Sequence, residues 1–368
     1  MARLEEICDI LDSRRIPITA SDRKPGPYPY YGANGIQDYV SDYIFDDELV
    51  LLAEDGGNFG SKEKPIAYRV SGKCWVNNHA HVLKPKDMLD VDYLCYSLMF
   101  YDVSGLVNGA TRQKLTQADM RKMEIPLRSM YEQKRITAVI NKVSDLISLR
   151  KQQLAKLDEL VKSRFVELFG TIHDNKFGYE IKTLQDVCEQ IKDGTHQTPT
   201  YTDDSVNGYK FLSSKDVTTG KIDWAHLKYI PEELHNELYA RIAPRKGDIL
   251  LAKNGTTGIA AIVDREEIFD IYVSLALLRP IEINSVYLWA AINSVETKQQ
   301  FDASLKGIGV PNLHLGEIKK ARIIVPPVEE QNQFAEFVKK TDKSKLAIQQ
   351  SLDKLETLKK SLMQKYFG

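Results

Sequence analysis

The strongest constraint on this chain is an internal repeat of two stretches that align without a gap. Residues 132–170 fall on residues 330–368 at an offset of 198 positions (330 − 132), and both copies begin with Glu-Gln and end with Phe-Gly. An internal repeat implies a repeated structural unit. We therefore expect the same architecture to occur twice.

Each copy carries apolar residues in alternating steps of four and three, a pattern that predicts a long amphipathic helix with a coiled-coil seam. The predicted seam positions are Ile136, Ile140, Val143, Ile147, Arg150, Leu154, Leu157, Val161, Arg164 and Leu168 in the first copy, and Phe334, Val338, Thr341, Lys345, Ile348, Leu352, Leu355, Lys359, Leu362 and Tyr366 in the second. At ~1.5 Å per residue such a helix is roughly 58 Å long. We expect the two helices to pair with each other, antiparallel. The alternative is that each pairs with a helix of another molecule.

The ends of the first helix are marked. Ser129 and Glu132 have the spacing of a capping box, in which each side chain accepts a backbone N–H of the first turn. Pro126 disfavours an earlier start. Gly170 can take the left-handed conformation that ends a helix.

A globular segment of short strands and turns precedes each helix. We divide the chain into residues 1–126, 127–170, 171–325 and 326–368. Residues 184–188, 248–252 and 274–280 of the second segment resemble residues 4–8, 48–53 and 78–85 of the first, while the loops between them differ. The expected fold is α+β, with two similar mixed α/β domains separated by two long antiparallel coiled-coil-like helices and related by a pseudo-twofold axis.

Composition narrows the class of protein. The 368 residues include 50 basic and 51 acidic side chains, so a DNA site would have to come from local patches. Cys8, Cys74, Cys95 and Cys188 lack metal-ligand spacing and are expected to be reduced core residues of a cytoplasmic protein. We expect no signal peptide, because no charged and then apolar stretch follows Met1, and the longest apolar runs are too short to span a bilayer.

Several motifs occur together in a distinctive order. Residues 28–35 (YPYYGANG), 54–56 (EDG) and 78–79 (NH) lie in the first segment, and residues 193–199 (DGTHQTP) and 247–250 (GDIL) lie in the second. Residues 325–331 (VPPVEEQ) open the second helix. With these motifs, nearly the whole chain resembles the specificity subunit (HsdS) of type I restriction–modification enzymes. Residues 125–133 depart from that pattern, because they lack the double proline.

The resemblance implies a non-catalytic subunit with two DNA target recognition domains. It implies double-stranded DNA, two methyltransferase subunits and restriction/motor subunits as partners. S-adenosylmethionine, ATP and Mg would then be bound by partner subunits, with no cofactor in this chain. The sequence agrees, since it contains neither a GxxxxGK[ST] phosphate loop nor the Asn-Pro-Pro-Tyr/Phe motif of adenine methyltransferases.

Candidate DNA contacts are loop residues whose basic groups can pair with phosphates and whose amides can recognise base edges. In the first domain they are Arg23, Lys24, Tyr30, Tyr31, Asn58, Lys62, Lys64, Arg112, Gln113 and Lys114. In the second they are Lys192, Thr195, His196, Gln197, Ser213, Ser214, Lys215, Lys253, Asn254 and Lys306. The alternative for each basic residue is a solvated surface charge, and for the tyrosine pair it is packing.

Other polar residues are expected to be structural. His79 and His81 alternate on a predicted strand without further ligands at metal spacing, which favours framework histidines. Asp55 and Asp248 are expected to cap turns. We predict no metal site and no catalytic residue.

The predicted mechanism is recognition of a bipartite, asymmetric target. Each domain would recognise one half-site, and the paired helices would set the spacer between them. A partner methyltransferase would flip an adenine out of each half-site, and other partners would cleave. One alternative is a specificity subunit of a methylation-only or fused system. Others are a coiled-coil scaffold whose two β domains bind ligands other than DNA, and an enzyme using Cys or His.

Overall fold

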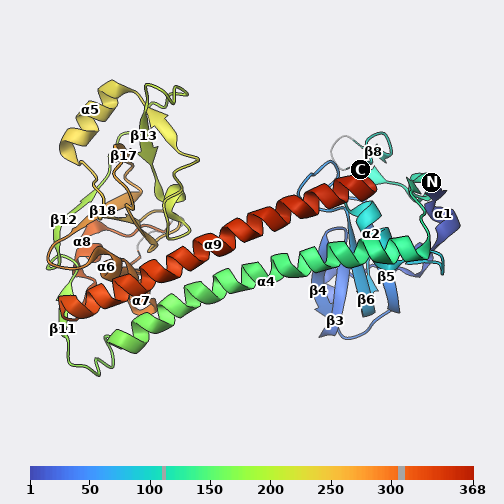
Figure 1. The fold of residues 1–368 in the computed structure, drawn as a ribbon, viewed down its shortest axis with the longest axis horizontal. Helices are drawn as coiled ribbons and strands as arrows, with labels where there is room; N and C mark the ends of the chain where they lie inside the picture. The colour runs from blue at the N-terminus through green and yellow to red at the C-terminus, as the bar shows by residue number, and fades with distance from the viewer. Residues whose placement is uncertain (110–112, 306–310) are drawn as a thin grey trace. The chain divides into compact units, whose positions relative to one another are not determined.

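The computed structural model describes residues 1–109, 113–305 and 311–368. These residues form two compact units, the first from Met1–Lys151 with Gln350–Gly368 and the second from Gln152–Gln349. Each unit contains part of both long helices, α4 (Met130–Phe169) and α9 (Val328–Phe367) (Figure 1). The division at residues 126, 170 and 325 stays a prediction.

The two helices pair within each unit, as the repeat predicted. In the second unit Asp158 forms an ion pair with Lys345 at 2.5 Å, and the rings of Phe165 and Phe334 lie 5.5 Å apart. Residue numbers rise along α4 while they fall along α9, so the helices are antiparallel. In the first unit Lys151 pairs with Glu356 at 2.9 Å. All twenty predicted seam positions are buried or half-buried, which confirms the predicted seam.

The predicted helix ends are also confirmed. Ser129 Oγ accepts a hydrogen bond from Glu132 N at 3.3 Å, and Glu132 Oε2 accepts one from Ser129 N at the same distance. At the other end Gly170 has φ +72°, a conformation that glycine adopts without steric cost.

The first unit is built on a six-stranded sheet in the order β2-β7-β5-β6-β3-β4. The strands are β2 (Cys8–Ile10), β3 (Pro25–Gly32), β4 (Gly35–Val40), β5 (Phe45–Ala53), β6 (Ala67–Val76) and β7 (Ala80–Pro85). Residues 49–53 of β5 are fully buried, because both faces of this strand are covered. That burial explains the unbroken apolar sequence of β5.

Short elements complete the first unit. The helices are α1 (Leu4–Ile7), α2 (Val91–Met99) and α3 (Gln117–Lys122), and the 3₁₀ turns are η1 (Asp12–Arg14) and η2 (Ala20–Asp22). Two small ladders pair β1 (Ala2–Arg3) with β10 (Glu124–Ile125), and β8 (Val107–Asn108) with β9 (Lys114–Leu115).

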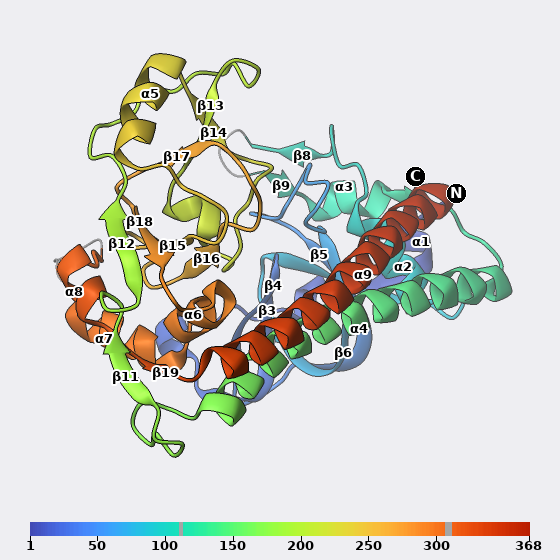
Figure 2. The same cartoon turned by 60° about the vertical axis from the view of Figure 1, so that its left-hand side comes forward.

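The second unit contains a four-stranded sheet in the order β12-β18-β15-β16 (Figure 2). These strands are β12 (Cys188–Asp193), β15 (Ile249–Ala252), β16 (Ala260–Ile262) and β18 (Leu275–Pro280). A separate sheet joins β14 (Lys228–Ile230), β13 (Tyr209–Leu212) and β17 (Phe269–Ile271). β11 (Glu180–Thr183) pairs with β19 (Arg322–Val325).

The helices of the second unit lie beside these sheets. They are α5 (Glu232–Arg241), α6 (Ser285–Ile292), α7 (Val295–Ser304) and α8 (Leu315–Lys320), with one 3₁₀ turn, η3 (Ser214–Val217). Helix α5 packs next to β17 in both views (Figures 1 and 2).

The two units share one framework. The order β2-β7-β5-β6 in the first unit corresponds to β12-β18-β15-β16 in the second. Register corresponds too, since Cys8 pairs with Pro85 and Cys188 pairs with Pro280. The predicted structural repeat of the globular segments is therefore confirmed.

Candidate nucleic-acid interface

Loops at one end of the first sheet gather into a group that we call the first loop cluster, comprising Asn34, residues 54–57, residues 77–79 and residues 113–114. Glu54 N donates to His79 O at 2.9 Å and Gly56 N donates to Gln113 O at 3.3 Å. Asn34 Nδ2 donates to Gly56 O at 3.0 Å. Backbone hydrogen bonds and the side-chain amide of Asn34 thus hold four separate segments together at the ends of β3, β5 and β6.

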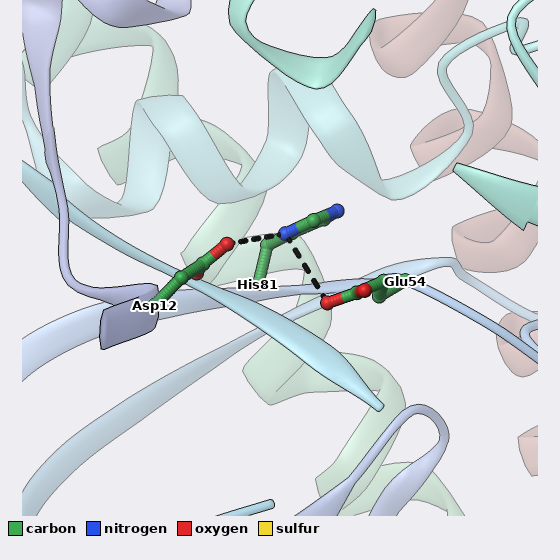
Figure 3. A group of neighbouring side chains, drawn as sticks. All are labelled: Asp12, Glu54 and His81. Carbon is green, nitrogen blue, oxygen red and sulfur yellow. Dashed lines mark hydrogen bonds and ion pairs between the residues drawn. The ribbon is translucent and has the colours of Figure 1, made fainter. Parts of the chain in front are cut away.

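A buried ion network supports this cluster. Asp12 Oδ2 lies 2.7 Å from His81 Nδ1, and Glu54 Oε2 lies 3.6 Å from the same nitrogen (Figure 3). Arg15 donates to Glu54 at 2.6 Å, and the ammonium of Lys114 lies 3.0 Å from the other oxygen of Glu54. Burial opposes ionisation of Asp12 and Glu54, but the hydrogen bonds from His81 to Asp12 and from Arg15 to Glu54 outweigh it, so both pKa values are lowered.

Asp12, Glu54 and His81 lie close enough together to be a possible metal-ligand set within the described part of the chain. His81 directs Nδ1 at Asp12 and places Nε2 3.0 Å from Leu115 O, which leaves no ring nitrogen directed at an ion. The carboxylates already face Arg15 and Lys114. A divalent cation would have to displace these groups, so the set does not fit a metal.

His81 is fully buried and both of its ring nitrogens have a hydrogen-bond partner, as predicted for a framework histidine. His79 Nδ1 lies 2.6 Å from Asp55 Oδ1, so Asp55 is bonded across the cluster. Asp248 accepts a hydrogen bond from Arg245 N at 2.9 Å, which confirms its predicted turn-capping role.

The corresponding loops of the second unit form the second loop cluster, comprising residues 193–197, 213–215, 253–254, 272–274 and 312–316. Lys253 N donates to Ser274 O at 2.9 Å, and Leu313 N donates to Lys253 O at 2.8 Å. Ser214 N donates to Ser274 Oγ at 3.0 Å. The cluster encloses an open cavity of about 500 Å³ whose lining includes Asp193, His196, Lys253, Asn254, Asn312 and His314.

Asp193 is the centre of charge in the second cluster. Lys253 Nζ lies 3.2 Å away, His196 Nε2 3.0 Å away and Arg241 Nη2 3.3 Å away. Burial would raise the pKa of Asp193, but the bonds from Lys253 and His196 lower it. One carboxylate therefore faces three basic groups.

The two clusters correspond position by position. Leu115 N donates to Glu54 O at 2.7 Å, in the same way that Leu313 N bonds to Lys253 O. The backbones of Asp55 and Lys114 form an isolated antiparallel β-bridge, and those of Asn254 and Asn312 form another. The framework therefore places Glu54, Asp55 and Lys114 of the first unit where Lys253, Asn254 and Asn312 stand in the second.

The predicted DNA contacts differ in how exposed their side chains are. Lys24, Lys62, Lys64, Gln113, Lys114, Lys192, His196, Gln197 and Lys215 are exposed, and Arg23, Tyr31, Asn58, Ser213, Ser214 and Asn254 are half-buried. Arg112 and Lys306 lie outside the described residues. The first cluster brings Gln113 and Lys114 together, and the second brings together Thr195, His196, Gln197, Ser213, Ser214, Lys215, Lys253 and Asn254.

The structure corrects the prediction for Tyr30, which is 1% exposed. Its hydroxyl accepts a hydrogen bond from Ile18 N at 3.0 Å, and the guanidinium of Arg23 lies 4.3 Å from the centre of its ring. The segment that contains Ile18 and Arg23 therefore covers this side chain on its face of the sheet. Tyr30 therefore packs in the core, and Arg23 is bound to it and to Asp38.

The surroundings of three further predicted contacts differ from those of an exposed loop residue in a cluster, and their contact with DNA stays a prediction. Thr195 and Lys253 are buried instead of exposed, Thr195 through its bridge to Tyr272 and Lys253 through its pairing with Asp193. Lys24 precedes β3, whose other end carries the first cluster. At ~3.3 Å per residue the eight-residue strand places Lys24 about 26 Å from that cluster.

Arg15, Arg241, Asn312 and His314 were missed by the sequence analysis. A signal existed for Asn312, because the 198-residue offset of the repeat places Lys114 on it. Arg15 and Arg241 are hard to recognise from the sequence, because their partners Glu54 and Asp193 lie 39 and 48 residues away.

Among the described residues, no helix is long and apolar enough to cross a membrane. Two loop clusters on two copies of one framework, together with two long paired helices, define a class of protein with an internally repeated structure and two separate binding surfaces. The chain belongs to the family described as the type I restriction modification DNA specificity domain, whose model matches residues 1–159 and 177–359.

Individual relatives match over nearly the full length. A putative type I restriction enzyme specificity subunit of Haemophilus influenzae is 28% identical, with 98% of this chain and 94% of the relative covered. The MjaVIII specificity subunit of Methanocaldococcus jannaschii is 23% identical, with 99% and 90% covered. The crystal structure of the type I restriction–modification S subunit from M. genitalium has the same fold, with a TM-score of 0.60, 15% identity, and 100% of this chain and 95% of that chain covered.

Proposed function

We propose that this chain is the DNA-specificity subunit of a type I restriction–modification complex. The observation that carries the proposal is the presence of two unlike loop clusters on two copies of one framework, in a chain that belongs to the specificity-domain family. A shared framework with different loops is what recognition of two different sequences requires, because base contacts come from the loops.

The clusters differ in charge at corresponding positions. The acidic Glu54 corresponds to the basic Lys253, and the acidic Asp55 corresponds to the neutral Asn254. Lys114 is basic, whereas Asn312 is neutral. The donors and acceptors offered to base edges therefore differ, and the two half-sites should differ in sequence. The target is then bipartite and asymmetric.

Both long helices pass from one unit into the other. Their length is the natural determinant of the number of base pairs between the half-sites. Each helix has 40 residues, which corresponds to about 60 Å of α-helix at ~1.5 Å per residue. The helical surfaces outside the seam are the docking surfaces that we propose for two methyltransferase subunits.

The chemistry belongs to partner subunits in this proposal. Burial raises the pKa of Cys8, Cys74, Cys95 and Cys188 to about 12, so these thiols do not form thiolate nucleophiles near neutral pH. Methyltransferase partners would flip and methylate adenine with S-adenosylmethionine, and ATP- and Mg-dependent restriction subunits would cleave. A methylation-only or fused system is the alternative within the same class.

An exchange of recognition domains tests the proposal. Residues 1–126 are replaced by the first domain of another family member, and methylated sites are mapped in a host that carries the partner methyltransferase. One half-site should change while the other half-site and the spacer persist. A change in both half-sites, or methylation without sequence preference, contradicts the proposal. Salt-insensitive or absent DNA binding by the assembled complex would instead favour the scaffold alternative.

A further inference from the structure

The cavity of the second loop cluster contains two unsatisfied acceptors. Asn254 Oδ1 and Asn312 Oδ1 are shielded from water and have no hydrogen-bond partner among the residues that the structure describes. The two residues face each other across an isolated antiparallel bridge, and both line the cavity. Leaving a buried acceptor unpaired is unfavourable, so the site is incomplete without a donor.

A donor lies next to these acceptors. Lys253 is the residue before Asn254 and is 6% exposed, yet it also lines the cavity. Its ammonium has three N–H donors, and Asp193 Oδ2 is 3.2 Å away. The cavity therefore combines two amide acceptors with a basic donor held in a fixed position by a carboxylate.

We propose that this cavity receives the major-groove edge of a base that carries an exocyclic amino group, and that Asn254 Oδ1 and Asn312 Oδ1 share the one N–H of that group that Watson–Crick pairing leaves free. This inference rests on the proposed function, because it takes DNA as the ligand. Lys253 donates to the neighbouring N7 or O6 acceptor of the same base step. The side-chain amides turn into the cavity by rotation about χ2, a broad torsion for asparagine.

The arrangement discriminates between the strands of the duplex. Every base pair presents one amino group in the major groove, on adenine N6 or on cytosine N4. Because the two asparagine acceptors have a fixed position, they determine which strand of the duplex carries the adenine or cytosine at one position of the target. In the first unit the corresponding residues are Asp55 and Lys114, and Lys114 is paired with Glu54. The requirement should thus apply to the second half-site alone.

The test uses the intact complex with its methyltransferase subunits and duplexes of its mapped target. Each adenine of the second half-site is replaced in turn by purine, and each cytosine by pyrimidin-2-one, which removes one amino group at a time. At constant salt, the wild-type complex should lose about tenfold in affinity at one position. No sensitive position in the second half-site would overturn the inference.

Variants assign the effect to the cavity. In Asn312→Leu the loss caused by the missing amino group should be clearly smaller than in wild type, because only Asn254 still accepts, whereas Asn312→Asp, which keeps an acceptor oxygen and nearly the same shape, should retain the full loss. Asn236→Leu, on the exposed face of α5, is the matched control and should behave as wild type. Amino-group removal in the first half-site should have equal effects in wild type and Asn312→Leu.

Each outcome has a distinct meaning. If Asn312→Leu shows the same loss as wild type, the inference is wrong while the proposed function stands. If thermal melting shows that Asn312→Leu does not fold, Asn254→Leu takes its place as the variant that lacks one acceptor. If Asn312→Asp is no longer sensitive to removal of the amino group, acceptance of a hydrogen bond by residue 312 is also contradicted. If the wild-type complex lacks sequence-specific binding, the proposed function itself fails.

Discussion

The side-chain oxygen of Gln133 accepts a hydrogen bond from the backbone N–H of Asp90 at 2.8 Å. Gln331 makes the same bond to Asn284, also at 2.8 Å. Each glutamine lies in the first turns of a long helix, and each partner is the N-cap of the helix that follows a central strand, α2 or α6. The repeat therefore extends to individual side-chain bonds at the place where each long helix joins its globular unit.

Loss of Gln133 should destabilise the first unit. Its amide nitrogen also donates to Met88 O at 2.9 Å and Arg128 O at 2.8 Å, and the side chain is fully buried. Gln133→Leu removes the partner of three partly buried backbone groups and should lower the free energy of unfolding by about 2 kcal/mol. Urea denaturation measures the change. Gln333→Leu, at an exposed position of α9, should change stability by less than about 0.5 kcal/mol.

Replacing a charged seam residue with an apolar one should stabilise the paired helices. Lys345 occupies a seam position with its side chain 15% exposed and is paired with Asp158, which is largely exposed. Lys345→Met fills the seam without a buried charge and should raise the free energy of unfolding by roughly 1 kcal/mol. Lys354→Met, at an exposed position on the same helix, is the control. A loss of stability in Lys345→Met would show that the ion pair matters more than the apolar seam.

The buried pair of Asp270 and His235 predicts a pH dependence of stability. Burial raises the pKa of Asp270 to about 6, although His235 donates to it at 2.7 Å and opposes the shift. A carboxyl group whose folded pKa lies above its unfolded value stabilises the fold in its protonated form. Its contribution is present below the unfolded pKa of about 3.9 and is lost as pH rises through about 6.

Melting temperatures from pH 4 to pH 7 measure this contribution. Wild type should lose stability relative to Asp270→Asn as the pH rises, because the amide cannot ionise. A parallel pH dependence in the two proteins would contradict the shift. Asp264→Asn, at an exposed position of the same unit, should follow the wild-type profile.

The ion network below the first cluster should affect one half-site selectively. Glu54→Gln removes the partner of Arg15, whose side chain is 12% exposed, and of Lys114. We expect a loss of about 2 kcal/mol in stability, since the buried guanidinium of Arg15 keeps only Asp12, at 3.4 Å, as a charged partner. Weaker recognition should follow in the first half-site only, as measured by the affinity for duplexes with substitutions in either half. Glu63→Gln, exposed in the neighbouring loop, is the control.

The length of the paired helices should set the spacer. Four residues are inserted after Lys151 in α4 and four after Gln349 in α9, which lengthens both helices by ~6 Å. Coiled coils accept four-residue insertions as local changes of supercoil. With a rise of ~3.4 Å per base pair, the methylated target should gain about two base pairs of spacer. An insertion of equal length between Asp203 and Asp204, in an exposed loop, should leave the spacer unchanged, and an unchanged spacer in the helix variant would contradict the model of the helices as a ruler.

Sequence reasoning was most successful for the helices. Every position that the four-and-three spacing predicted is buried or half-buried, including the polar residues Thr341 and Lys345, although Phe165, which contacts Phe334, was not among them. Periodicity is a local property, because it depends only on which residues share one face of a helix. Leu115 and Leu313, which the same 198-residue offset relates (313 − 115), are also structurally equivalent, since both backbone N–H groups bond at corresponding positions.

The candidate site was predicted less well. Tyr30 and Thr195 have the composition of binding loops but are buried. Composition identifies a side chain that could contact DNA and does not say whether another strand covers it. Arg15 and Arg241 were missed because each reaches a carboxylate far away in the sequence.

The sequence by itself determined that this chain contains one architecture twice, with two long helices and apolar central strands, because repeats and hydrophobic periods are properties of neighbouring residues. Tertiary structure decided which polar groups are exposed, which are paired and which are left unsatisfied. Asn254 and Asn312 are separated by 58 positions (312 − 254), and only the pairing of their segments makes them two acceptors of one cavity. Hydrogen-bond satisfaction depends on distances of about 3 Å between such remote atoms, and only the folded framework fixes those distances.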